Sequence, residues 1–285
     1  MGTVRIPDPI GFEARMRDLL LEREAENHLM LGILGTLGRH PAAPGEKRFF
    51  WTVQDGSRVL GGALWTPPFK PVLARLAGPE LAGLLDRMEE DAAPLNGASG
   101  PGGVAARFAE LWSSRHGGEV RRVMGMRIRE CREIAGLATP PGTFRQATTG
   151  DLESVLSWGR DFHASIGLNE PVEVAKELDE YLAERRLFVW VRAECPVSMA
   201  GWTGPTPNGA RLNLVYTPPA ERGKGYSKAC VAGVCRWLFA NGRRRVFLFA
   251  DADNPVSNRV YDRVGFADVS DWDLYEFPPS PPPMG

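Results

Sequence analysis

The feature that most constrains the fold is a turn rich in proline and glycine between an apolar strand and a helix. Residues 214–228 have the sequence LVYTPPAERGKGYSK. The strand ends at Thr217, two prolines turn the chain, and Arg222-Gly-Lys-Gly225 opens the helix. Glycines let the backbone approach a ligand closely, and the N–H groups of a first helical turn point outward at the positive end of the helix dipole. The pattern indicates a phosphate or pyrophosphate cradle, with a basic turn that uses glycine only for its geometry as an equal alternative.

Another segment, which ends at Phe266, has the sequence NPVSNRVYDRVGF. Asn254 stands where a helix N-cap belongs, Pro255 takes the first helical position, and Gly265 ends the helix. Tyr261 follows Asn254 by seven residues, so both side chains share one face of the helix. By itself this segment is typical of a capped helix with a tyrosine in the core.

Hydrophobic periodicity and turn residues predict an alternation of strands and helices around these two segments. Thr148 or Thr149 can cap the first of the helices, which has acidic residues in its first turn. The predicted elements are strand 144–147, helices 148–165 and 171–185, strands 187–192, 199–203 and 211–217, helix 226–241, strand 246–250, helix 255–264 and strand 272–277.

Together, in this order and spacing, the two segments resemble the signature motifs of the GNAT N-acetyltransferase superfamily. The segment at Arg222 matches the pattern Arg/Gln-x-x-Gly-x-Gly/Ala, and the segment at Asn254 is similar to the Asn-x6-Tyr-x3-Gly-Phe block. The resemblance covers about residues 144–277. It implies an α/β fold of the α+β kind, with a mixed, mostly antiparallel central sheet flanked by helices.

The resemblance also implies roles for individual residues toward acetyl-CoA, or another acyl-CoA, as the donor. The strand before the cradle would pair with the pantetheine arm, the helix start would hold the pyrophosphate, and Asn254 would contact the arm. Tyr261 would protonate the leaving thiolate, a task that suits a phenol. The expected donor-binding residues are Val215, Tyr216, Thr217, Arg222, Gly223, Lys224, Gly225, Tyr226, Ser227, Lys228 and Asn254.

The sequence departs from the family pattern at two positions. Ser227 replaces the final Gly or Ala of the cradle motif, and serine is small enough to fit. Many members place a glutamate base five residues before the asparagine, where this chain has Phe249. Asp251 and His163 are weak candidates for the base, and a solvated acid and a surface histidine are the stronger interpretations. The base therefore stays unidentified.

The N-terminal half repeats the same coarse order of elements without the cradle. Residues 70–84 occupy its place and contain no Arg-x-x-Gly-x-Gly. The glycine-rich residues 96–103 could bind an anion at the next helix start, but a flexible turn is the stronger interpretation. We therefore expect residues 1–138 to form a degenerate GNAT-like domain. A linker at 139–143, a catalytic domain at 144–277 and a disordered proline-rich tail at 278–285 complete the expected organisation.

The composition of the chain narrows the kinds of partner that we expect it to bind. The chain has 34 Lys and Arg against 35 Asp and Glu, a net charge of -1, which gives no overall attraction to nucleic acid or to an anionic membrane. It has no apolar run of membrane-spanning length and no signal-peptide plan, so we expect a cytoplasmic protein. The four cysteines form no CxxC pair, which favours buried thiols and no metal site.

These observations predict an acyl-CoA N-acyltransferase that acts by direct attack of a primary amine. The acceptor would be a small molecule or a peptide. One alternative is a CoA-binding regulatory module without turnover, motivated by the missing glutamate. Another is a tandem-domain transferase for an aminoacyl-tRNA or a peptide, although the near-neutral charge disfavours tRNA. The sequence leaves the acyl length and the oligomeric state open.

Overall fold

The computed structural model describes residues 1–91, 95–166 and 173–278 of the chain. It divides into two compact units, Met1–Ile128 with Val269–Gly285, and Arg129–Asp268. The division therefore falls before the expected linker at 139–143, and the chain returns to the first unit at its end. Residues 279–285 of the expected tail lie outside the described residues.

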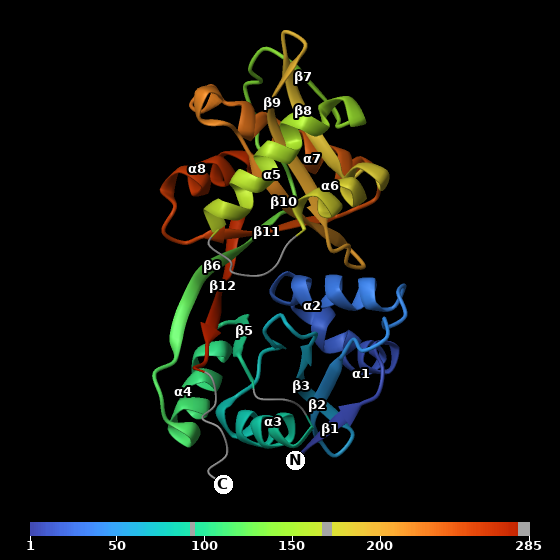
Figure 1. Ribbon diagram of the computed structural model, residues 1–285, viewed down its shortest axis with the longest axis vertical. Coiled ribbons are helices and arrows are strands. Elements are labelled where there is room, and N and C mark those ends of the chain that lie inside the picture. The colour runs from blue at the N-terminus through green and yellow to red at the C-terminus, as the bar shows by residue number, and fades with distance from the viewer. Residues whose placement is uncertain (92–94, 167–172, 279–285) are drawn as a thin grey trace. The chain divides into compact units, whose positions relative to one another are not determined.

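Both repeats of the chain follow the same order of elements: a strand, two helices, three strands, a helix, a strand, a helix and a strand (Figure 1). The first repeat comprises β1 (Gly2–Ile6), α1 (Pro9–Glu22), α2 (Glu24–Leu37), β2 (Phe49–Asp55), β3 (Arg58–Trp65), β4 (Val72–Leu73), α3 (Gly78–Asp91), β5 (Gly97–Pro101), α4 (Val104–His116) and β6 (Arg121–Cys131). The second comprises β7 (Thr143–Gln146), α5 (Leu152–Ile166), α6 (Val174–Ala183), β8 (Leu187–Arg192), β9 (Cys195–Thr203), β10 (Gly209–Tyr216), α7 (Tyr226–Ala240), β11 (Arg245–Asp251), α8 (Pro255–Val264) and β12 (Ala267–Glu276).

The last strand of the chain lies in the sheet of the first unit. In the first unit the strand order is β1-β2-β3-β4-β5-β12. There β12 pairs antiparallel with β5, with Trp272 opposite Pro101 and Glu276 opposite Gly97. In the second unit the order is β11-β10-β9-β8-β7, and β6, which crosses the boundary between the units after Ile128, is next to β11 in the strand order. The first unit thus takes its last strand from the second repeat, which local sequence patterns cannot reveal.

The expected flexible turn at 96–103 is wrong, because most of it is the buried strand β5. Its sequence, GASGP, has low strand propensity, which hid the strand from sequence analysis. Small residues are needed there because neighbouring elements pack closely. A Cβ at Gly100 would lie 2.6 Å from Val104 Cγ1 and 3.0 Å from the Leu73 carbonyl oxygen. Close packing against α4 and β4 therefore outweighs propensity.

Helices cover both faces of the sheet in the first unit. On one face α1 packs against β3, where a Cβ at Gly62 would lie 3.3 Å from both Phe12 and Met16. On the other face the buried sides of α3 and α4 pack against β2 and β3. Residues of this second cluster include Trp51, Ala63, Leu81, Leu84, Leu85, Phe108 and Trp112.

The second unit has the same layered plan, with α5 and α6 on one face of the sheet and α7 and α8 on the other (Figure 1). The α7 face buries Val231, Val234 and Leu238 against β8 and β11. A separate cluster, which includes Val155, Leu178 and Met199, fills the space under α5 and α6. Thr148 forms a capping box with Asp151 before α5, so one of the two predicted caps is confirmed.

Two expectations from composition can be compared with the structure. No helix among the described residues is long and apolar enough to cross a membrane. Three cysteines are buried as expected, but Cys195 is exposed because it begins β9 directly after a turn.

Candidate functional site

The site begins where the two central strands of the second unit separate. β10 and β11 run parallel, and their ladder covers only residues 209–211 of β10 and 245–247 of β11. Both strands continue beyond it, to Tyr216 and Asp251. Because the later backbone groups of these neighbours are not paired with each other, a wedge opens between them toward their C-terminal ends. This wedge leaves strand N–H and C=O groups available to an extended ligand.

A β-bulge changes the direction of the β10 backbone where the strand borders the wedge. The antiparallel register between β10 and β9 shifts between Asn213 and Tyr216, and Leu214 has a φ of 51°. A left-handed conformation is uncommon for a leucine and is maintained here by burial of its side chain. Bulges leave backbone groups out of the ladder, so Leu214 and Val215 can turn an N–H toward a bound carbonyl.

Side chains hold the end of β10 in place. Ser198 Oγ donates to the Tyr216 carbonyl at 3.1 Å and lies 2.8 Å from Thr217 Oγ1. Arg222 Nε donates to the Thr217 carbonyl at 2.9 Å, which folds the following turn back onto the strand. Lys224 Nζ lies 3.1 Å from Glu221 Oε2. Both basic side chains of the cradle motif therefore stabilise the turn itself.

The start of α7 has the geometry expected of an anion cradle. Gly223 and Gly225 have φ angles of 78° and 85°, a region that other residues rarely adopt. Gly225 is the N-cap and has no side chain, so the first N–H groups of α7 receive no side-chain cap. Tyr226 is buried and its hydroxyl accepts a bond from Arg192 Nη1 at 2.8 Å. In this turn the backbone, rather than the tyrosine side chain, faces outward.

The remaining cradle residues lie on the following turn of α7. Ser227 and Lys228 are half-buried. Lys228 lines a cavity of about 470 Å³ beside α7, together with the aromatic rings of Phe144, Trp190 and Trp237. A lysine at this place adds positive charge next to the helix start.

Asn254 caps α8 as the sequence predicts. Its Oδ1 accepts from Val256 N at 3.2 Å and from Ser257 N at 3.1 Å. The capping bonds use the side-chain oxygen and so leave the Nδ2 group as the part that could donate to a ligand.

Tyr261 lies two turns further along α8 in the core beside α7. Its side chain is 8% exposed and packs edge-on against Phe266, with ring centroids 5.8 Å apart. Burial raises the pKa of Tyr261 to about 12, and the charge of Arg129 offsets part of that rise. The phenol is therefore protonated over the whole physiological range and can act as a proton donor.

The two predicted base candidates each have a local partner. His163 Nε2 lies 2.7 Å from Glu177 Oε2, which links α5 to α6. Asp251 ends β11, and its Oδ1 accepts from Asp253 N at 2.9 Å. Phe249 is half-buried two residues earlier on the same strand. The role of either candidate as a base stays a prediction.

The structure brings one further acid to the wedge that sequence analysis missed. Asp161 of α5 accepts a hydrogen bond from the Tyr216 hydroxyl at 2.9 Å. Burial, followed by this carboxylate, raises the pKa of Tyr216. Asp161 is exposed and lies 55 residues from Tyr216 in the chain, so no local pattern could have paired them.

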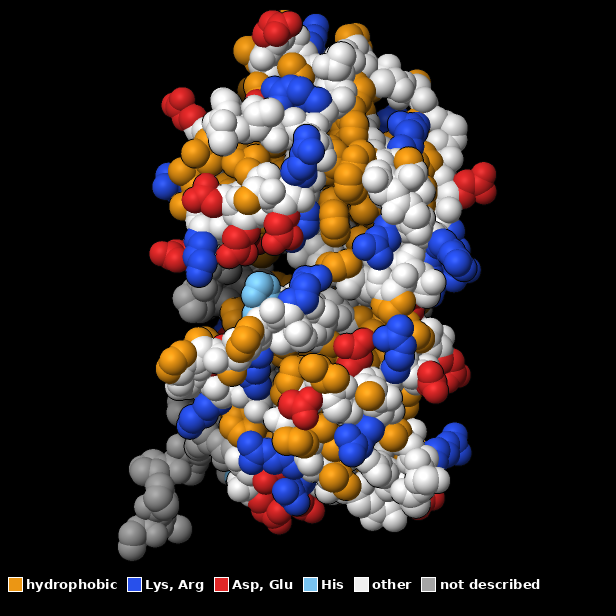
Figure 2. Space-filling view, turned by 90° about the vertical axis from the view of Figure 1, so that its right-hand side faces the viewer, with side chains coloured by type: hydrophobic (Ala, Val, Ile, Leu, Met, Phe, Trp, Pro, Cys, Tyr) orange, Lys and Arg blue, Asp and Glu red, His pale blue; other side chains and the backbone are white. Residues whose placement is uncertain are grey.

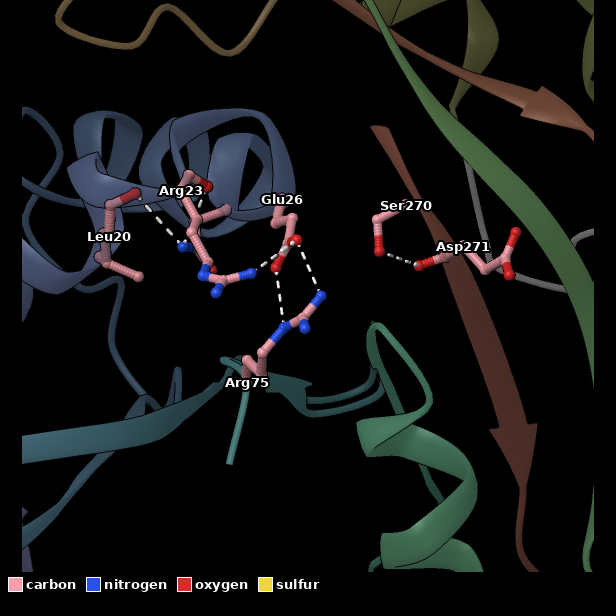
Figure 3. Close-up of polar contacts among 7 residues, drawn as sticks. Leu20, Arg23, Glu26, Arg75, Ser270 and Asp271 are labelled. Carbon is pink, nitrogen blue, oxygen red and sulfur yellow. Dashed lines mark hydrogen bonds and ion pairs between the residues drawn. The ribbon is translucent and has the colours of Figure 1, made fainter. Parts of the chain in front are cut away.

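The equivalent place in the first unit is chemically different. A pocket of about 540 Å³ lies at the start of α3. There Pro79 lacks an N–H, and the Glu80 carboxylate already lies at the positive end of the helix. Arg75 of this pocket donates to both oxygens of Glu26, at 3.0 and 2.8 Å (Figure 3). Arg107 Nη2 donates to the Leu76 carbonyl at 3.1 Å.

Comparison with known proteins finds a family model that matches most of the second unit. The model of the acetyltransferase (GNAT) family matches residues 152–266. Among curated proteins, none matches the chain in sequence. The chain is similar in fold to a GNAT-family acetyltransferase from Colwellia psychrerythraea, which is 12% identical with a TM-score of 0.58 over 98% of this chain and 100% of that one.

Two further solved structures match almost the whole chain. A GCN5-related N-acetyltransferase from Sphaerobacter thermophilus is 16% identical, with a TM-score of 0.62 over 98% of this chain and 96% of that one. A tandem GNAT protein from the clavulanic acid biosynthesis pathway is 13% identical, with a TM-score of 0.57 over 98% and 99%. These likenesses concern the fold, whereas the family match falls on the wedge, the cradle and α8. The chain thus has the fold of two GNAT domains in tandem, and residues 152–266 of its second unit match the model of the acetyltransferase (GNAT) family.

Proposed function

We propose that the second unit transfers an acetyl group from acetyl-CoA to a primary amine of a small molecule or a peptide. The observation that carries this proposal is the juxtaposition of the β10–β11 wedge with the glycine-opened start of α7. The donor's pyrophosphate would bind the N–H groups from Gly223 to Lys228. Its pantetheine arm would follow Val215, Tyr216 and Thr217 along the free edge of β10.

The residues of the wedge suit direct transfer. A neutral amine attacks the thioester carbonyl, the C–N bond forms, and the C–S bond breaks with the electron pair leaving on sulfur. A backbone N–H at the bulge around Leu214 would stabilise the developing oxyanion. Tyr261 would give its proton to the sulfur, and its raised pKa keeps that proton in place until charge develops.

Acidic groups on the α5 side would receive the amine. Asp161 lies against Tyr216 at the wedge, and the pair of His163 and Glu177 bridges the neighbouring helices. A carboxylate attracts an ammonium group and can accept its proton directly or through water. Asp161 therefore joins Asp251 and His163 as a candidate for the base.

We further propose that the first unit binds no donor. At the start of α3, Gly78 does not have the left-handed φ of Gly223 and Gly225. The same helix start carries Glu80, whose negative charge would repel a pyrophosphate. The N-cap of α4, which corresponds to Asn254, is Gly103 and offers no side chain. The first unit would then serve the structure or the acceptor rather than the chemistry.

The charge pattern favours a small acceptor over tRNA. Basic and acidic side chains are interspersed on the face of the molecule that Figure 2 shows. Recognition of a nucleic acid backbone requires a continuous basic surface. With 34 basic and 35 acidic residues in the chain, the composition gives no such surface overall.

A donor titration and an acceptor screen test the proposal. Calorimetry with acetyl-CoA is expected to give one site per chain, and a panel of primary amines is expected to release free thiol and the N-acetyl product. Two equivalent sites or no binding would contradict the donor assignment. Tight binding without transfer to any amine would favour the regulatory alternative.

A further inference from the structure

An arginine that has no counter-charge among the described residues lies at the base of the wedge, on the sheet face that α5 and α6 cover. We call this side of the second unit's sheet the acceptor face. Arg211 of β10 is half-buried there, level with Thr203 of β9 and Phe247 of β11. Two residues later on β10, Asn213 donates to the Tyr181 hydroxyl of α6 at 3.0 Å, which fixes the face on which these side chains lie.

Arg211 differs from several arginines of the second unit that have carboxylate partners. Arg145 pairs with Asp151 at 2.7 Å, Arg129 with Asp268 at 2.6 Å, and Arg245 with Glu130. Among the described residues, the contact of the Arg211 guanidinium is with the ring of Phe249, 5.8 Å from its centroid, and no hydrogen bond or ion pair joins it to another side chain. A largely desolvated charge without a partner is costly to keep, and such groups are usually paired.

The side chain leans toward the reaction centre. Arg211 is level with Phe247, but its guanidinium lies over Phe249, two residues further along β11. Because β10 and β11 are parallel and separate beyond residue 211, this direction leads into the wedge. The guanidinium therefore lies between the closed base of the wedge and the bulge at Leu214.

The chemistry around Arg211 selects the kind of group it would bind. Burial lowers the pKa of Arg211, yet a guanidinium keeps its proton in proteins. The planar fork matches the two oxygens of a carboxylate. Phe249 adds an apolar wall and no competing negative charge. An ammonium group would be repelled at this spot and attracted to Asp161 at the open end.

We propose that Arg211 binds the carboxylate of the acceptor, so that the substrate is an amine that also carries a carboxylate, such as an amino acid or a peptide with a free C-terminus. This inference rests on the proposed acetyl transfer and specifies its acceptor. Residues along a strand rise about 3.3 Å each, so one to three residues separate the level of the guanidinium from the bulge. The carboxylate and the amine of the acceptor are then roughly 3 to 10 Å apart.

Matched acids and amides test the assignment in the full chain. The probes are glycine, β-alanine and 6-aminohexanoate with their amides, which vary the distance between amine and carboxylate. Acetyl transfer is followed by thiol release, and binding of each probe to the CoA-saturated protein is measured by calorimetry. At the best spacer length we expect the acid to have at least a tenfold lower KM than its amide.

Substitution of the arginine isolates its contribution. Arg211→Met is expected to raise the KM of the acid about 10- to 100-fold, in line with loss of a charge-assisted pair. It leaves the Kd of acetyl-CoA and the kcat/KM of the amide within about threefold, as expected for a group that contacts only the carboxylate. Arg211→Lys keeps the positive charge but not the planar guanidinium. The KM of the acid for this variant is therefore expected to lie between those of the wild type and Arg211→Met. Arg236→Met removes an exposed arginine from α7, on the other face of the sheet, and is the matched control.

Several outcomes would overturn the inference. They are an acid that binds no better than its amide in the wild type, a preference that persists in Arg211→Met, and an equal weakening of acid and amide. A tenfold preference for aminomethylphosphonate over glycine would assign the site to a phosphate-like group instead. Absence of donor binding in the wild type would refute the proposed function, and calorimetry of the acid and the amide with the protein free of CoA would still decide the role of Arg211. If Arg211→Met does not fold, the Arg211→Lys variant carries the same comparison.

Discussion

Removal of the Tyr261 hydroxyl gives the sharpest test of the proposed chemistry. Tyr261→Phe keeps the ring, which packs against Phe266 in the α7–α8 core. A general acid typically contributes about 100- to 10,000-fold to a rate, and water can replace part of that contribution. We therefore expect kcat to fall by roughly tenfold or more, while the Kd of acetyl-CoA stays within a few fold.

The raised pKa gives the same substitution a further, independent signature. Tyr261 titrates with a pKa of about 12 in the folded protein, against an ordinary value of 10.0. The unfolded chain loses the phenolic proton first, so stability falls as pH rises from 10 to 12. A difference of two pKa units corresponds to about 3 kcal/mol. Below pH 9 this contribution is fully present, and wild type and variant differ there only by the hydroxyl.

Two assays compare the wild type with Tyr261→Phe over a range of pH. Single-turnover thiol release gives the chemical step, and urea unfolding between pH 9 and 12 gives the free energy of unfolding. Between pH 10 and 12 the wild type is expected to lose up to about 3 kcal/mol more than Tyr261→Phe. Tyr275→Phe, in the first unit, is the control and should leave kcat unchanged.

Two results would refute this reasoning. If Tyr261→Phe turns over like the wild type with its proper acceptor, the hydroxyl does not protonate the thiolate. Water or another group would then have that role. If the alkaline loss of stability is the same in both proteins, the hydroxyl is not buried as the structure places it.

Three further predictions concern donor binding. Gly225→Val forces a branched side chain onto a φ of 85° and is expected to raise the Kd of acetyl-CoA at least tenfold; unchanged affinity would exclude the cradle. Asn254→Ala should raise the donor KM and cost on the order of 1 kcal/mol of stability, whereas Asn254→Asp should keep the cap and raise only the KM; equal KM values for Asp and Asn would make the residue a cap alone. Arg75→Met should leave the single donor site unchanged in calorimetry, because Arg75 is engaged by Glu26; loss of a binding event would show a donor in the first unit.

Local chemistry determined much of the second unit. The strand Leu187–Arg192 and the helix Pro255–Val264 have the predicted bounds, because an apolar run and an N-cap with a following proline act over a few residues. The glycines of the cradle have left-handed φ angles, which glycine adopts more readily than other residues. Gly-rich strand β5 was missed because its order comes from neighbours rather than from its own propensity.

What the sequence by itself determined is therefore the set of short-range features: helix caps, glycine turns, apolar strands and the two motifs that resemble GNAT. Only the tertiary structure decided which strands pair, that β12 joins β5, and that β10 and β11 separate beyond residue 211. It also brought Asp161 to Tyr216 and placed Arg211 over Phe249 without a carboxylate partner among the described residues. These features depend on contacts between residues far apart in the chain, whose free energy comes from packing and desolvation that no local pattern records.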